Sequence, residues 1–210
     1  MNSKLTKSDK LNIALFLLLA FIAFIKILIP INAYASGNWK GYAVYRDGAF
    51  FNVNDHAAIM NKDTKSESSP VVHSPGPFQT VQYGSWSDFI NGNNFICICR
   101  PNNCTMSSYQ DVFASKAREL MGISYTVFDQ IDYDAGSAYW VLPENITDLR
   151  CDGVVEFTYE WYGKRVGGSD SYWDITRNTS SHKSEHGGLN ITPRKQNDNL
   201  LTFVTYNEPT

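Results

Sequence analysis

Three residues of the 210-residue chain have side chains and surroundings suited to nucleophilic chemistry: Cys151, His56 and His73. A thiol attacks as the thiolate, and a helix N-terminus together with an imidazolium can lower a thiol pKa from about 8.5 to below neutrality. A nearby histidine can accept the thiol proton, and a third polar group can orient that histidine. The spacing leaves a plain alternative open, in which both histidines are structural and Cys151 is a small core side chain.

The segment that carries Cys151, residues 149–163, has the length of a helix, although several of its residues favour strands. Asp148 or Thr147 can cap this helix, which places Cys151 near its first turn. The free N–H groups there would stabilise a thiolate and the oxyanion formed on an attacked carbonyl. A carboxylate at Asp152 raises the pKa of a neighbouring thiol, so we expect this side chain to point away from the sulfur or to cap the helix.

The two histidines lie on short apolar segments, residues 55–60 and 70–74, which we expect to be strands. If these strands are neighbours in a sheet, His73 can hold and polarise His56. We also expect strands at 95–99 and 199–206 and a hairpin that turns at Asp47-Gly48.

The clearest predicted helix spans residues 108–121. Its apolar residues recur at steps of three and four, which predicts one buried face. That face comprises Val112, Phe113, Ala117, Leu120 and Met121.

The remaining cysteines and histidines suggest structural roles. In a strand Cys97 and Cys99 point to the same face, and an oxidising compartment would favour a local disulfide between Cys104 and one of them. Two zinc-type cysteine pairs are absent from the sequence, so a structural zinc site has little support. His182 and His186 have the spacing of a metal pair, but their Ser-, Asn- and Gly-rich surroundings favour a solvated loop.

Residues 1–35 have the pattern of an export signal: a lysine-rich start, an apolar run, and Ala33-Tyr34-Ala35 as a cleavage site. An uncleaved membrane anchor is the alternative. The whole chain has a formal net charge of −3, and residues 1–35 carry four lysines against one aspartate. Residues 36–210, which we expect to form one domain, therefore carry −6, and this acidity argues against a nucleic-acid partner.

A longer pattern resembles the NlpC-type papain-like cysteine peptidases. Residues 149–157 are similar to the Cys-x-Gly-hydrophobic helix start of that family, and residues 55–60 to its histidine strand. The order His, His, Cys is that of the circularly permuted branch. The stretch between also fits, with Arg100-Pro101 after a strand and an Ala-rich helix that ends in Leu-x-Gly-x-x-Tyr (residues 120–125), so the resemblance covers roughly residues 40–165.

The resemblance implies an α+β, permuted papain-like fold, with a small antiparallel sheet or half-barrel packed against the Cys151 helix. It implies that Cys151 is the nucleophile, His56 the general base and His73 the orienting residue, and that no metal or organic cofactor is needed. The implied substrates are amide bonds in cell-wall (peptidoglycan) peptides or, as in acyltransferase-like members, acyl lipids. The enzyme would be exported, periplasmic or extracellular, and would contact a membrane only through an uncleaved residue 1–35 segment.

Two explanations without catalysis remain open at this point. The chain could be a binding module that retains the fold without activity. It could also be a disulfide-stabilised structural protein, which requires Cys151 to be bridged.

Overall fold

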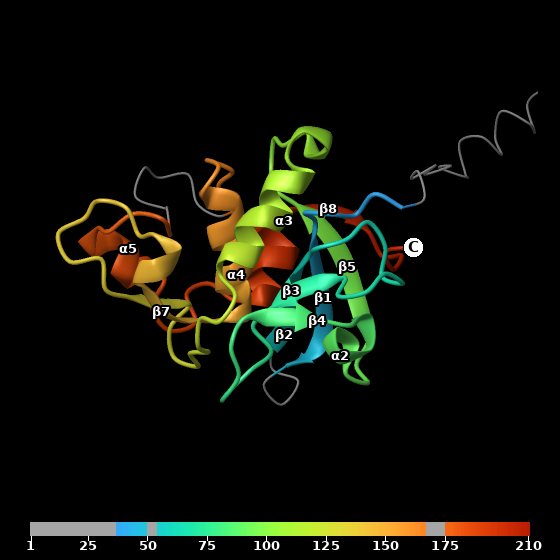
Figure 1. Ribbon diagram of the computed structural model, residues 1–210, viewed down its shortest axis with the longest axis horizontal. Coiled ribbons are helices and arrows are strands. Elements are labelled where there is room, and N and C mark those ends of the chain that lie inside the picture. Colours follow the sequence, from blue (N-terminus) through green and yellow to red (C-terminus); the bar gives the residue numbers. More distant parts are fainter. Residues whose placement is uncertain (1–36, 50–53, 167–174) are drawn as a thin grey trace, which may run out of the picture. The chain divides into compact units, whose positions relative to one another are not determined.

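The centre of the fold is a six-stranded antiparallel sheet with strand order β4-β3-β2-β1-β5-β8 (Figure 1). The structure is a computed structural model that describes residues 37–49, 54–166 and 175–210. The strands are β1 (Ala43–Ala49), β2 (Asn54–Met60), β3 (Val71–His73), β4 (Gln82–Gly84), β5 (Phe95–Arg100) and β8 (Thr202–Thr205). A separate two-stranded sheet pairs β6 (Ile131–Tyr133) with β7 (Ile146–Leu149).

The helices of the described residues are mostly short. They are α2 (Trp86–Ile90), α3 (Gln110–Glu119), α4 (Cys151–Glu160), α5 (Ser180–Glu185) and α6 (Pro193–Lys195). Single turns of other helix types are η1 (Met106–Ser108), η2 (Pro143–Asn145) and η3 (Gln196–Leu200). Together these elements confirm the predicted α+β class.

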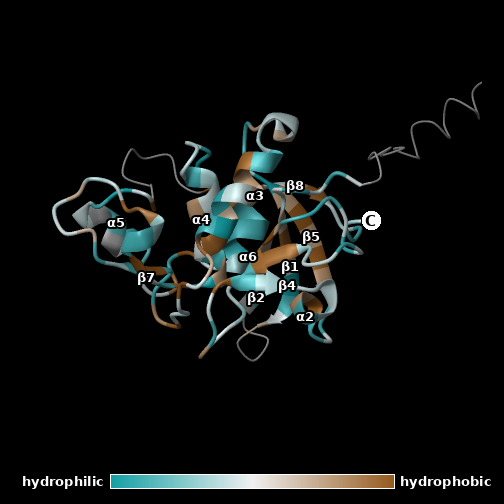
Figure 2. Ribbon diagram, in the orientation of Figure 1, coloured by the Kyte–Doolittle hydropathy of each residue, from teal (hydrophilic) through white to brown (hydrophobic). Residues whose placement is uncertain are grey.

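Two apolar clusters hold the sheet, one on each face. Alternate side chains of a strand point to opposite faces, so Ala43 and Tyr45 of β1 join one cluster while Val44 joins the other. The first cluster also takes in α3 and α4, and Figure 2 shows hydrophobic residues along β1 and β5 beside them. Residues 37–210 form one compact unit that contains both clusters.

Helix α4 confirms the helix expected near residues 149–163, but it begins at Cys151 with Arg150 as an N-cap whose side chain makes no capping bond. The prediction that Asp148 or Thr147 caps it is wrong. Every residue from Cys151 to Glu160 is buried, because α4 packs against β2 and α3 and is also covered by residues 130, 186 and 196.

Other predicted elements are confirmed with changed details. Helix α3 is shorter than expected, and of its predicted face Val112 and Met121 are 37% and 38% exposed. Asp47 and Gly48 do not form a hairpin turn, because β1 continues through them to Ala49 with a register shift. Gly48 takes a φ of 78°, and the Asp47 carboxylate accepts a hydrogen bond from Asn94 N–H at 2.7 Å, so the pair forms an irregularity inside the strand.

Residues 1–35, expected to be an export signal or anchor, lie outside the described residues. Within the described ranges, no helix combines the length and apolarity needed to cross a bilayer.

Gly153 lets α4 approach the chain segment beside it. A Cβ at this position would lie 2.6 Å from the Gln130 carbonyl oxygen and 2.6 Å from Leu149 Cδ1. Helix propensity alone would favour alanine over glycine by up to about 1 kcal/mol. The close backbone contact reverses this preference, because the Gln130 carbonyl accepts a hydrogen bond from the N–H of Arg150, the residue before α4, and cannot move freely.

We therefore predict that Gly153→Ala lowers the free energy of unfolding by about 1–3 kcal/mol, the usual effect of overpacking. Urea denaturation measures it. Ala114→Gly in α3 is the reference for helix propensity. A gain in stability for Gly153→Ala would contradict the close approach.

Candidate active site

A pocket of about 880 Å³ lies at the N-terminus of α4, and Cys151 and His56 both line it. Its wall includes apolar residues from three loops, namely Pro75, Pro77, Val127, Phe128 and Leu189. The structure thus brings together two of the residues that the sequence singled out, from segments 95 positions apart in the chain.

The Cys151 sulfur lies against β2. As the first residue of α4, Cys151 has its side chain among the free N–H groups of the first turn. Backbone N–H groups of Ala57 and Asp152 act to lower the pKa of the Cys151 thiol. Ala57 and the preceding His56 point to opposite faces of β2: Ala57 belongs to the cluster that includes α4, whereas the His56 ring contacts Phe89 of the other cluster.

His56 and His73 meet as expected, because β2 and β3 are neighbouring antiparallel strands. Nε2 of His56 lies 2.9 Å from Nδ1 of His73, within hydrogen-bond distance. The Phe89 ring contacts both imidazoles, with centroid distances of 5.6 and 6.0 Å. A Cβ at Gly84 of β4 would lie 2.7 Å from His73 Nε2, so this glycine provides space for the ring.

The pKa values of the site correct one expectation. Burial, followed by the charge of Asp152, raises the pKa of the Cys151 thiol to about 12. Burial also lowers the pKa of His73 to about 4 and that of His56 well below 6.5. The expectation that the helix N-terminus depresses the thiol pKa is wrong for this structure: desolvation outweighs the N–H groups, and thiol and imidazole are both neutral at pH 7.

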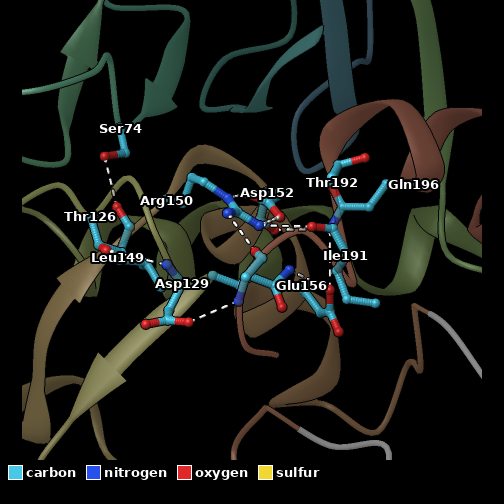
Figure 3. A network of polar contacts seen from close by, with 12 residues as sticks. Ser74, Thr126, Asp129, Leu149, Arg150, Asp152, Glu156, Ile191, Thr192 and Gln196 are labelled. Carbon is cyan, nitrogen blue, oxygen red and sulfur yellow. Dashed lines mark hydrogen bonds and ion pairs between the residues drawn. The ribbon is translucent and has the colours of Figure 1, made fainter. Parts of the chain in front are cut away.

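The alternative that Asp152 caps α4 is wrong, because its side chain pairs with Arg150 instead. Its carboxylate is fully buried and accepts two hydrogen bonds from Arg150, Nε to Oδ1 at 2.7 Å and Nη2 to Oδ2 at 2.9 Å (Figure 3). Arg150 also donates to the Gly188 and Ile191 carbonyls, at 2.9 and 2.7 Å. This pairing keeps a carboxylate beside the thiol without leaving its charge uncompensated.

A second buried carboxylate, Glu156, escaped the sequence analysis. Gln130 Nε2 and Gln196 Nε2 donate to its Oε2 at 2.7 and 3.3 Å, and His186 Nδ1 lies 3.7 Å from Oε1. Burial raises the pKa of Glu156 to about 8 and lowers that of His186 to about 2. A glutamate between Val155 and Phe157 in a strongly apolar helix was the available signal for a buried acid.

The solvated-loop prediction for residues 182–186 is wrong. His182 and His186 are 0% and 1% exposed, at and just beyond α5, and His182 stacks on Tyr133 with ring centroids 5.2 Å apart. No group of three or more His, Cys, Asp or Glu side chains that could hold a metal occurs among the described residues.

The predicted local disulfide is not present, and all four cysteines are free. Cys97 and Cys99 do share one face of β5, with sulfurs 3.5 Å apart, whereas Cys104 contacts Met106. Because Cys151 is not bridged, the structure also contradicts a disulfide-stabilised structural protein that depends on it.

Glu156 generates a prediction on the pH dependence of folding. Its pKa is higher in the fold than the usual 4.5, so the folded protein retains a proton that the unfolded chain releases. This stabilisation is complete below about pH 4.5 and is lost as the pH rises through about 8. Glu156→Gln mimics the protonated form, so from pH 5.5 to 8.5 the wild type should lose about 3 kcal/mol more unfolding free energy than this variant.

Urea denaturation at the two pH values measures the difference. Glu144→Gln, at an exposed glutamate, is the matched control and should follow the wild type. Parallel pH profiles for the wild type and Glu156→Gln would contradict a buried, protonated Glu156.

Comparisons of the chain with models of known protein families, with curated proteins and with solved structures find no match.

Proposed function

We propose that this protein is a cysteine hydrolase in which Cys151 attacks a carbonyl group and His56 accepts the thiol proton. The observation that carries the proposal is that Cys151 and His56 line the same pocket, with Cys151 as the first residue of a buried helix. His56 Nε2 lies within hydrogen-bond distance of His73 Nδ1, so Nδ1 of His56 is the nitrogen that would accept the thiol proton. This is the nucleophile, base and orienting group of a catalytic triad.

The neutral resting state determines the order of events. The thiol pKa of about 12 leaves little thiolate at pH 7, so proton transfer to His56 accompanies attack on the carbonyl carbon. The sulfur–carbon bond forms as the carbonyl π bond opens to an oxyanion. His56 then returns the proton to the leaving group as the thioester forms, and water hydrolyses the thioester with His56 as base.

The first turn of α4 supplies donors for the oxyanion. The Cys151 and Asp152 N–H groups lie at the free end of the helix, where partial positive charge accumulates. Such donors stabilise the transition state more than the neutral carbonyl, and losing one typically costs a factor of about 100 to 1,000 in rate.

Three features support the permuted papain-like arrangement as part of the proposal. The nucleophile starts a buried helix, the helix packs on an antiparallel sheet, and the two histidines lie on neighbouring strands that precede the cysteine in the chain. The same proposal includes export directed by residues 1–35.

The pocket favours acyl lipids over cell-wall peptides as substrates. Its wall exposes mainly apolar surface, from proline, valine, phenylalanine and leucine side chains near Cys151. An acyl chain gains about 0.8 kcal/mol for each buried methylene, whereas the polar groups of a cell-wall peptide would lose hydrogen bonds to water there. We therefore propose hydrolysis or transfer at an acyl ester or amide.

Substitutions at the three site residues test the proposal. With acyl esters, phospholipids and muropeptides as substrates, Cys151→Ala should abolish product formation. His56→Ala should lower kcat by about 10² to 10⁴, the usual contribution of a general base. His73→Ala should leave part of the activity, because its role is to orient His56.

Cys104→Ser is the matched control, since Cys104 is another buried thiol and does not line the pocket. It should keep wild-type activity. Loss of muropeptides instead of acyl substrates would replace the substrate class but retain the mechanism. Equal turnover by wild type and Cys151→Ala would indicate that Cys151 is not the nucleophile, and a folded wild type inactive on all three substrates would favour a binding module.

The neutral thiol predicts the pH dependence of alkylation. The rate at which iodoacetamide modifies Cys151 should rise continuously from pH 5 to pH 9, because the thiolate fraction increases throughout a range below a pKa of about 12. Mass spectrometry of the peptide that contains Cys151 measures the rate. A plateau below pH 7 would show a preformed thiolate and contradict the neutral pair.

A further inference from the structure

Large apolar side chains project into solvent at the mouth of the Cys151 pocket. Phe128 and Leu189 line the pocket and are 81% and 65% exposed. Phe78 is fully exposed and follows Pro77, another lining residue. We call Phe78, Phe128 and Leu189 the apolar rim.

Hydrogen bonds join the three loops that carry the apolar rim. Tyr125 N–H donates to the Gln79 carbonyl at 3.1 Å, which ties the Phe128 loop to the Phe78 loop. Gly188 N–H donates to Asp129 Oδ1 at 2.8 Å, which ties the Phe128 loop to the Leu189 loop (Figure 3). The rim is thus a connected surface rather than three separate side chains.

The charged residues of the pocket wall are Arg46, Arg150, Arg194, Lys195 and Asp55. Arg150 is paired with Asp152 and Arg194 with Asp55, whereas Arg46 and Lys195 donate to backbone carbonyl groups, so these two cations contribute a positive charge to the pocket wall. The Lys195 ammonium donates to the Leu189 carbonyl at 3.0 Å, which places a positive charge directly at the rim.

We propose that the apolar rim docks on an anionic lipid bilayer and brings the mouth of the Cys151 pocket to the membrane surface. Exposed aromatic and aliphatic side chains enter the interface of a bilayer, and adjacent cations are attracted to anionic headgroups. A docked pocket would receive an acyl chain without that chain crossing water. The inference rests on the proposed function only for what enters the pocket; docking itself does not require catalysis.

Co-sedimentation with vesicles tests the docking. The protein without residues 1–35, which keeps the whole compact unit, should sediment with phosphatidylglycerol vesicles and less with phosphatidylcholine vesicles. The triple variant Phe78→Asn, Phe128→Ser, Leu189→Ser should bind phosphatidylglycerol vesicles at least tenfold more weakly. Asn suits position 78 because Phe78 has a φ of 65°, a conformation that asparagine tolerates.

The double variant Phe203→Ser, Tyr206→Ser is the matched control. It removes two exposed rings at the β8 edge of the sheet, opposite the β4 edge, and should bind as the wild type does. Equal loss in the control and the rim variant, or sedimentation of the wild type with peptidoglycan but not with vesicles, would overturn the proposal. Cys151→Ala should bind normally, so a failed docking test and a failed catalytic test remain distinguishable.

A second measurement does not depend on loss of binding. Phe128→Trp adds a tryptophan on the rim to the five that the chain already has, so brominated phosphatidylglycerol should raise the quenched fraction above that of the wild type by more than it does for Phe203→Trp. Equal quenching of the two variants would place the contact elsewhere and overturn the proposal.

Discussion

The buried ion pair between Arg150 and Asp152 is the interaction on which the site depends. Because the guanidinium also holds the Gly188 and Ile191 carbonyls, it connects the start of α4 to the loop that carries Leu189. Breaking such a pair from one side leaves an uncompensated buried charge, which typically costs about 3–5 kcal/mol. The first turn of α4, the pocket wall and the rim are therefore held by one ion pair, whose two residues directly precede and follow Cys151.

The burial of α4 explains why the site residues are neutral and why its two carboxylates need hydrogen-bond donors. Cys151, His56 and His73 are at most 5% exposed, so their neutral forms are favoured. The same enclosure traps Glu156 and Asp152, and the fold supplies glutamine donors to one and an arginine to the other. Most buried polar groups in proteins have such a partner, because an unpaired one costs its lost hydration.

The sequence predicted the parts of the site that depend on local pattern. Strand-like runs around His56 and His73 and the helix that begins near Cys151 were recognisable from periodicity and length. The surroundings of those elements were not recognisable, because they come from distant segments. The Glu156 network, for example, forms when Gln130, His186 and Gln196 pack against α4. The composition of residues 182–186 is polar, so it gave no indication that His182 and His186 are buried.

Gly84 shows how the site constrains the edge of the sheet. The residue lies on the last strand of one side, where substitutions are ordinarily tolerated, yet the His73 ring occupies the volume that any side chain there would need. A substitution at position 84 therefore affects the imidazole pair. A homologue with a larger residue at 84 would need a smaller residue at position 73 or a displaced imidazole ring.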